Sequence, residues 1–404
     1  VKLFDYEQGV IEKEISTMDS IRYMEHFMHC GFVAIEPQTG HVKAWVGDLD
    51  FKTWKYDKVT AMRQPGSTFK LFVYAEAMNQ GITPCDTRQD SYFSMKVYDA
   101  RKKKDVLWAP TNADGRFSNA NITLKQAFAM SINSVAVKLG QEVGIPQIVK
   151  TAHDMGIKSK LDPTPALALG SSDVNLLELV NAYCTPVNNG KSHNPVLVER
   201  ILDREGNEIY NSSNNEQKQA LSAKSAFYVQ QRLMGGMHGT SSALYRFISK
   251  YLNDTDFGGK TGTSNNHSDA WFVGTTPNLV VGAWVGGEYR CIHFRTGQLG
   301  QGNKTALPVC GNFLELVWGD PAFKHYHAKF VTPKDLNTNA ILYNCGGYFK
   351  IPSDSDSLAT DSIQHPDNLT IDGQTNTGTP PSSEQSASQT PISTQPSAAE
   401  EPKE

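Results

Sequence analysis

The 404-residue sequence lacks three features that would indicate a protein class directly: a basic charge excess, a long apolar run and a signal peptide. Its net charge is only −4, so it lacks the basic excess of a nucleic-acid-binding protein. Its longest apolar run, residues 279–287, is far shorter than the ~20 residues that cross a membrane. It has no secretory signal peptide and begins with valine. We therefore expect part of a longer protein, with any membrane anchor upstream.

Cysteine and histidine patterns of metal sites are also missing. No cysteine belongs to a CxxC pair, which argues against a zinc or thioredoxin-like motif. His325 and His327 share one face of a strand, but no further ligand stands at a recognisable spacing, so we predict no metal and no cofactor. The sequence does not select a disulfide pairing, and we expect scattered buried thiols. The cysteines are Cys30, Cys85, Cys184, Cys291, Cys310 and Cys345.

Composition divides the chain into four segments. Residues 1–30 are polar and aromatic in mixture, and we predict a linker that ends in a short helix. Residues 31–325 carry alternating strand and helix patterns, and we predict one main domain there, followed by an extension over 326–352. Residues 353–404 contain no aromatic residue and are rich in Ser, Thr, Pro and Gln, so we predict a disordered tail.

Strand patterns stand at both ends of the main domain, with helical patterns between them. A hairpin is predicted over residues 32–46, and antiparallel strands over 258–263, 270–274 and 279–285. Helices are predicted over 67–80 and 123–139, ended by Gly81 and Gly140, and near 175–183 and 223–233. This order predicts an α+β fold whose terminal strands share one antiparallel sheet, with a functional groove beside a helical insertion.

Ser67 and Lys70 form an SxxK motif at the start of a predicted helix. Positions i and i+3 share a helix face, so the Lys70 amine can reach the Ser67 hydroxyl and act as its base. The helix N-terminus favours negative charge on the serine oxygen. Taken alone, the motif is a weak signal and is more often a serine N-cap followed by a surface lysine.

Two further motifs follow in the chain. Ser131 and Asn133 form an SxN motif inside the second predicted helix, where they offer a proton-relay hydroxyl and an amide that binds a peptide bond. Residues 260–263 read Lys-Thr-Gly-Thr on a predicted strand, and their charge and hydroxyls suit a carboxylate. Gly262 within the strand indicates close approach of a ligand or of the nucleophile's helix. Each motif is weak alone, whereas the ordered trio is typical of penicillin-binding proteins and class A β-lactamases.

The sequence resembles the transpeptidase domain of a class A (bifunctional) penicillin-binding protein over residues 31–319. Leu71 replaces a proline that is common in that family, and the glycosyltransferase domain that normally precedes this one is absent from the sequence. Beyond the trio, the resemblance rests on Arg63-Gln64-Pro65-Gly66 before Ser67, on Pro110-Thr111-Asn112 with Asp114-Gly115 and Phe117, on residues 168–172 with Glu178 and Tyr183, and on residues 269–274.

This resemblance implies a penicillin-binding transpeptidase-like fold, with a five-stranded antiparallel sheet, flanking helices and a helical subdomain. It also implies the roles of the site residues. Ser67 would be the nucleophile, Lys70 the base, and the backbone N–H groups of Ser67 and Thr263 the oxyanion hole. The catalytic residues implied are Ser67, Lys70, Ser131 and Lys260, and the substrate-binding residues are Asn133, Thr261, Gly262 and Thr263.

The implied function is D,D-transpeptidation of peptidoglycan stem peptides, with β-lactams as inhibitors. Three alternatives remain: a D,D-carboxypeptidase, a β-lactamase with Glu178 as the candidate base, and a non-enzymatic penicillin sensor or scaffold. The implied location is the outer face of a bacterial inner membrane, and other cell-wall synthesis proteins are possible partners of the tail. No nucleic-acid partner is expected.

Overall fold

The computed structural model describes residues 1–99, 102–212, 215–332, 343 and 345. The chain divides into two compact units, Val1–Asn368 and Leu369–Glu404, and all described residues belong to the first. The predicted tail over 353–404 lies outside the described residues, and the predicted boundaries at residues 31 and 325 remain predictions. Each helix in the described part of the chain is too short or too polar to span a bilayer.

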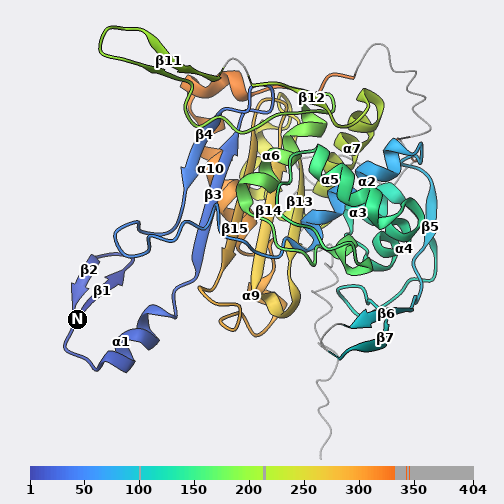
Figure 1. The fold of residues 1–404 in the computed structure, drawn as a ribbon, viewed down its shortest axis with the longest axis horizontal. Helices are drawn as coiled ribbons and strands as arrows, with labels where there is room; N and C mark the ends of the chain where they lie inside the picture. The colour runs from blue at the N-terminus through green and yellow to red at the C-terminus, as the bar shows by residue number, and fades with distance from the viewer. Residues whose placement is uncertain (100–101, 213–214, 333–342, 344, 346–404) are drawn as a thin grey trace, which may run out of the picture. The chain divides into compact units, whose positions relative to one another are not determined.

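A five-stranded antiparallel sheet runs through the centre of this unit (Figure 1). Strands from the two ends of the chain meet in it, because β15 pairs with β3, and Trp284 lies between Trp271 and Gly31 in the register. This confirms the predicted α+β fold and its sheet. In sheet order the strands are β13 (Gly258–Thr263), β14 (Asp269–Thr275), β15 (Val280–Gly286), β3 (His29–Ile35) and β4 (Val42–Val46).

Helices cover both faces of the sheet. Along β3, Val33 and Ile35 join the core beneath the helical subdomain, whereas Phe32 and Ala34 join a second core on the opposite face. The two-sided burial explains why the strands are apolar at nearly every position. The first core packs under α6 (Leu176–Val187) and α7 (Ala223–Gly235), and the second under α8 (Tyr245–Ile248) and α10 (Ala306–Gly319).

The helical subdomain differs from the prediction at one important point. The predicted helix over 123–139 is two helices, which break at Met130–Ile132, and Gly140 lies inside the second. The predicted helix over 67–80 begins as a 3-10 turn, η1 (Gly66–Phe69), and ends at Asn79. The subdomain helices are α2 (Lys70–Asn79), α3 (Leu124–Ala129), α4 (Asn133–Val143) and α5 (Ile145–Asp154).

The N-terminal residues fold more fully than the predicted linker. The short helix α1 (Thr17–Met24) is present, but β1 (Lys2–Asp5) and β2 (Gly9–Glu12) form an unpredicted hairpin before it. Phe4 of this hairpin packs its ring against Phe27 and Trp54, at 5.2 and 5.0 Å between ring centroids. The ring cluster joins the hairpin to the segment just before β3 and to the segment after β4.

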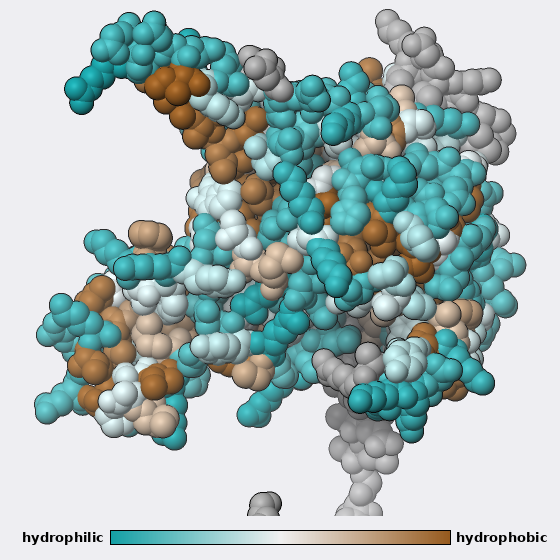
Figure 2. All heavy atoms as spheres, in the orientation of Figure 1, coloured by the Kyte–Doolittle hydropathy of each residue, from teal (hydrophilic) through white to brown (hydrophobic). Residues whose placement is uncertain are grey.

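Small two-stranded pairs and turns complete the described part. The paired strands are β5 (Thr87–Gln89) with β8 (Asn121–Thr123), β6 (Met95–Asp99) with β7 (Lys104–Trp108), β9 (Lys191–Ser192) with β12 (Lys218–Gln219), and β10 (Arg200–Leu202) with β11 (Glu208–Asn211). Figure 2 shows exposed apolar side chains over the N-terminal hairpin and the β10–β11 ribbon. The short helical turns are η2 (Pro165–Leu169), η4 (Gly236–His238), η5 (Ser242–Leu244), η6 (Ser249–Tyr251), η7 (Asn265–His267), α9 (Gly297–Gly300) and η8 (Pro321–Tyr326).

The expectation of scattered thiols is wrong for two cysteines. Cys85 and Cys345 form a disulfide that joins residues 260 apart in sequence. The sequence did not reveal this pair because only the fold brings the C-terminal segment beside the loop after α2. The other cysteines are free thiols, and Cys184 and Cys310 are buried.

Candidate active site

Ser67 lies in the η1 turn, which leads directly into α2. Two side-chain hydrogen bonds hold this turn: the Thr68 hydroxyl donates to the Pro65 carbonyl at 2.7 Å, and the Tyr183 hydroxyl donates to the Thr68 carbonyl at 2.7 Å. The Ser67 side chain is half-buried and lines the cavity between the sheet and the helical subdomain. The nucleophile candidate is therefore accessible on a rigid support.

Strand β13 packs backbone against backbone on this turn. A Cβ atom on Gly262 would lie 2.4 Å from the Pro65 carbonyl oxygen, and one on Gly66, whose φ is +53°, would lie 2.4 Å from the Thr263 carbonyl oxygen. Only glycine fits at such approaches. The predicted close approach of Gly262 to the nucleophile's helix is confirmed. It brings the backbone around Ser67 beside that of Thr263, as a shared oxyanion hole requires.

Lys70 is the first residue of α2, and its side chain is fully buried. Its Nζ lies 2.6 Å from the Ser131 carbonyl oxygen, 2.6 Å from Asn133 Oδ1 and 3.2 Å from Ser131 Oγ. Burial, reinforced by the positive charge of Lys260, holds the pKa of Lys70 well below its usual value. Such a lysine is predisposed to act as a neutral base.

Lys260 approaches the same serine from β13. Its Nζ donates to Ser131 Oγ at 2.9 Å and to the Thr261 carbonyl at 3.0 Å. Burial lowers the pKa of Lys260 to about 7. The hydroxyl of Ser131 therefore lies between two buried amines that come from different parts of the fold.

Ser131 is presented by the break between α3 and α4, not by a helix interior. Its φ of +58° is in the left-handed region, which is costly for a residue with a side chain. The Lys70 bond to its carbonyl helps to hold this conformation. Asn133, the first residue of α4, also donates through Nδ2 to the Thr111 carbonyl at 2.8 Å.

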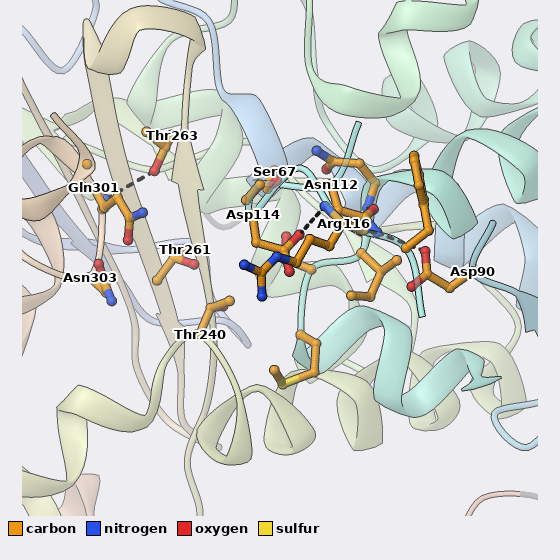
Figure 3. A pocket seen from close by; sticks show the side chains of 18 of the residues that line it. Ser67, Asp90, Asn112, Asp114, Arg116, Thr240, Thr261, Thr263, Gln301 and Asn303 are labelled. Atoms are coloured by element: carbon orange, nitrogen blue, oxygen red, sulfur yellow. Dashed lines mark hydrogen bonds between the residues drawn. The ribbon is translucent and has the colours of Figure 1, made fainter. Parts of the chain in front are cut away.

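The motifs meet at one cavity of about 970 Å³ (Figure 3). Ser67, Ser131, Asn133, Thr261 and Thr263 all line it, while Lys70 and Lys260 are fully buried and meet at the Ser131 side chain. Thr261 and Thr263 lie on one wall in Figure 3, and the loop with Asn112, Asp114 and Arg116 forms the opposite wall. The structure thus brings together every site residue predicted from the sequence, although their chemical roles remain predictions.

Sequence reasoning missed several residues that line this cavity. Asp90, Thr240, Gln301 and Asn303 contribute to its walls, yet they are distant in sequence from the three motifs. None belongs to a short pattern with its own chemistry, so no sequence signal identified them. Asn112 and Asp114 were noticed only as part of the family resemblance.

Comparison with known proteins agrees with this arrangement. The family model for the penicillin binding protein transpeptidase domain matches residues 30–283. Penicillin-binding protein 2D of Bacillus subtilis is 37% identical over 63% of this chain and 37% of its own length. Penicillin-binding protein 1A of Rickettsia felis is 31% identical over 71% of this chain and 38% of its own length. The chain thus spans less than two fifths of either of these two relatives.

Solved structures share the fold. Penicillin-binding protein 1A from Haemophilus influenzae has a TM-score of 0.67 at 24% identity, over 76% of this chain and 49% of that one. The PonA1 protein from Mycobacterium tuberculosis, solved in complex with penicillin V, has a TM-score of 0.61 at 22% identity, over 76% of this chain and 82% of that one. Together with the match over residues 30–283, these findings establish that the chain belongs to the penicillin-binding protein transpeptidase family and is homologous to the transpeptidase regions of penicillin-binding proteins 1A.

Proposed function

We propose that this chain is a peptidoglycan D,D-transpeptidase that crosslinks stem peptides through an acyl-enzyme on Ser67 and is acylated by β-lactams at the same serine. The observation that carries the proposal is the position of the Ser131 hydroxyl between the buried amines of Lys70 and Lys260, at the cavity lined by Ser67. Two pKa-lowered lysines around one relay hydroxyl suit acyl transfer without a metal or a histidine.

In the first step, Ser67 Oγ attacks the carbonyl carbon of the penultimate D-Ala. Neutral Lys70 accepts the serine proton, and the backbone N–H groups of Ser67 and Thr263 stabilise the oxyanion. Ser131 passes a proton to the nitrogen of the departing D-Ala as the C–N bond breaks, and the proton held by Lys70 replaces it on Ser131. In the second step, an amine of another stem peptide attacks the ester carbonyl, and the proton that it loses passes through Lys70 to Ser67 Oγ as the C–O bond breaks and the crosslink forms.

Substrate contacts follow from the polar groups of the cavity wall. Thr261 and Thr263 line the cavity and would bind the terminal carboxylate, with the charge of the buried Lys260 behind them, and Gly262 lets β13 lie against η1. The Asn133 amide already bonds Lys70 and Thr111, but a carboxamide has two lone pairs and two N–H groups. One of each is therefore available for the substrate's peptide bond.

The alternative of a β-lactamase requires a base that activates water for fast deacylation. Glu178 was the candidate, but its Oε2 accepts from the backbone N–H groups of Lys158 and Ser159, at 3.1 and 3.0 Å, and from the Ser159 hydroxyl at 2.7 Å. Glu178 is not among the described residues that line the cavity. These contacts favour a structural role for Glu178 and weigh against a β-lactamase.

The cellular setting is part of the proposal. The Cys85–Cys345 disulfide favours an oxidising compartment, which agrees with an extracytoplasmic site of action. On this proposal the parent protein is bifunctional, with a glycosyltransferase domain and a membrane anchor outside this sequence, and it works with other cell-wall synthesis proteins.

A two-substrate assay tests the proposal. The protein is incubated with a stem pentapeptide that ends in D-Ala-D-Ala and with an amine acceptor peptide, and products are separated by mass spectrometry. We expect free D-Ala and a crosslinked peptide in equal amounts, and neither with Ser67→Ala. Release of D-Ala without a crosslink would instead support a carboxypeptidase. Penicillin acylation without either product would support a sensor.

A further inference from the structure

A buried hydrogen-bonded pair, Asp90 and Asn112, lies against the first turn of α4 on the wall of the catalytic cavity (Figure 3). Neither residue belongs to the three motifs, and their exposed fractions are only 3% and 6%. Buried polar side chains are costly unless they are hydrogen-bonded, so each contact of this pair is informative.

The Asn112 amide caps α4 from outside the helix. Its Oδ1 accepts from the backbone N–H groups of Asn133 at 3.0 Å and Ser134 at 3.1 Å. These are N–H groups that a helix start leaves without intrahelical partners. The residue before α4, Ile132, has no side-chain oxygen and makes no cap bond, so Asn112 supplies the cap that the local sequence lacks.

Asp90 fixes the orientation of that cap. Its Oδ1 accepts from Asn112 Nδ2 at 2.8 Å and from the Ser134 hydroxyl at 2.6 Å, and its Oδ2 accepts from the Ser118 N–H at 2.8 Å. Asn112 Nδ2 also donates to the Arg116 carbonyl at 2.7 Å. The carboxylate thus ensures that the amide oxygen, not its nitrogen, faces α4.

The capped turn is the one that presents the relay serine and the binding amide. Asn133 is its first residue, and Ser131 stands two residues before it in the costly left-handed conformation. Lys70 bonds both of them. A shift of α4 would therefore move Ser131 and Asn133 together away from the lysine.

We propose that Asp90 and Asn112 are positioning residues for acyl transfer: as a pair they cap α4 and hold Ser131 and Asn133 against Lys70. The inference rests on the proposed function, because it assigns a role in the acylation of Ser67. The negative charge of Asp90 near the N-terminus of α4 also interacts favourably with the helix dipole.

The test exchanges the two side chains. Asn112→Asp keeps a capping oxygen but places a carboxylate against Asp90 and the Arg116 carbonyl. We expect it to lower the second-order rate constant for benzylpenicillin acylation by at least about tenfold, as small misplacements of catalytic groups do. Adding Asp90→Asn restores one amide donor facing one carboxylate, so the double variant should recover part of the loss, while the repulsion from the Arg116 carbonyl remains. If Asn112→Asp does not fold, Asp90→Asn alone should lower the constant, by less.

The matched control is Asn181→Ala. Asn181 is also buried and donates to a backbone carbonyl, that of His193, but it lies in α6 and does not touch α4's cap. Loss of the Asn181 side chain and its hydrogen bond should lower the melting temperature and leave the acylation rate constant unchanged. The inference is overturned if Asn112→Asp acylates like the wild type, if the double variant recovers nothing, or if Asn181→Ala loses acylation equally. Failure of the wild type to acylate at Ser67 would instead overturn the proposed function.

Discussion

At the scale of single residues, the contacts of Lys70 connect the proposed base to its relay. Two of its three partners, the Ser131 carbonyl and Asn133 Oδ1, can only accept hydrogen bonds. The third partner, the Ser131 hydroxyl, accepts from Lys70 at 3.2 Å and from Lys260 at 2.9 Å. The base is therefore connected to its relay before the substrate arrives.

The lowered lysine pKa values predict how acylation depends on pH. In the unfolded chain these lysines would stay charged up to about pH 10.4. In the fold, the pKa of Lys70 is well below its usual value, so the neutral base appears at lower pH, whereas loss of the Lys260 charge above about pH 7 would weaken carboxylate binding. We expect the benzylpenicillin acylation constant to rise with pH on a limb well below 10. A pH-independent rate, or a limb near the ordinary lysine value, would contradict this account.

The relay role of Ser131 predicts a selective loss. Ser131→Ala keeps the backbone but removes the hydroxyl that both lysines contact. We expect acylation to fall by about 100-fold or more, as for loss of a proton-transfer group, with little change in melting temperature. Ser225→Ala is the matched control, because Ser225 is a buried serine of α7. Equal acylation by the two variants would show that Ser131 is not a relay.

At the scale of elements, the decisive contact is that of β13 on η1. The carbonyl of Pro65 and the α-carbon of Gly262 leave no room for a side chain. This contact sets the spacing between the nucleophile and the strand that would bind the substrate carboxylate. A change at Gly262 therefore tests geometry without removing a functional group.

We predict that Gly262→Ala lowers acylation by at least about tenfold, because its Cβ must separate β13 from η1. Gly235→Ala is the control: Gly235 closes α7, and an added Cβ would meet only Lys125 Cγ at 3.8 Å. Alanine there should preserve acylation and stabilise the helix slightly. Acylation rates and thermal unfolding are measured for both variants. A wild-type acylation rate for Gly262→Ala would show that acylation does not depend on the close contact between β13 and η1.

The limits of sequence-based prediction are clearest at Ser131. The strands, the start of α3 at its Thr123 cap and the end of α2 before Gly81 follow local patterns, and the structure contains them. The break at Ser131 does not, because residues 130–132 carry no Gly or Pro, and contacts with Lys70 from a distant helix stabilise it. The cap from Asn112 was equally hidden, since it acts across the fold. Local patterns thus predicted the motif residues, whereas long-range contacts determine their geometry.

At the scale of the whole molecule, the site exists only where two parts of the chain meet. The sheet contributes Lys260 through β13, and the helical subdomain contributes Lys70 and Ser131. Two described residues near the C-terminus contact the helices on this side of the sheet: Cys345 is bonded to Cys85 after α2, and the Tyr343 ring lies 5.2 Å from that of Phe227 in α7. The disulfide closes a loop that contains the motifs at residues 131–133 and 260–263, whereas Ser67 and Lys70 precede it.

Reduction of this disulfide should destabilise the fold. A loop of 260 residues gives an entropic stabilisation of about 5 kcal/mol in the chain-entropy treatment, as an upper value. We expect a reductant to lower the melting temperature of the wild type and to have no effect on Cys85→Ser. Cys291→Ser, which removes an exposed free thiol, should respond to reductant as the wild type does. Identical melting with and without reductant in the wild type would contradict the stabilising role.

Intact-mass spectrometry after incubation with benzylpenicillin tests the central claim most directly. We expect one covalent adduct on the wild type, stable over hours and mapped to Ser67, and none on Ser67→Ala. An adduct that persists on Ser67→Ala, or a wild type that neither retains nor consumes the drug, would contradict the assignment of Ser67 as the acylated nucleophile.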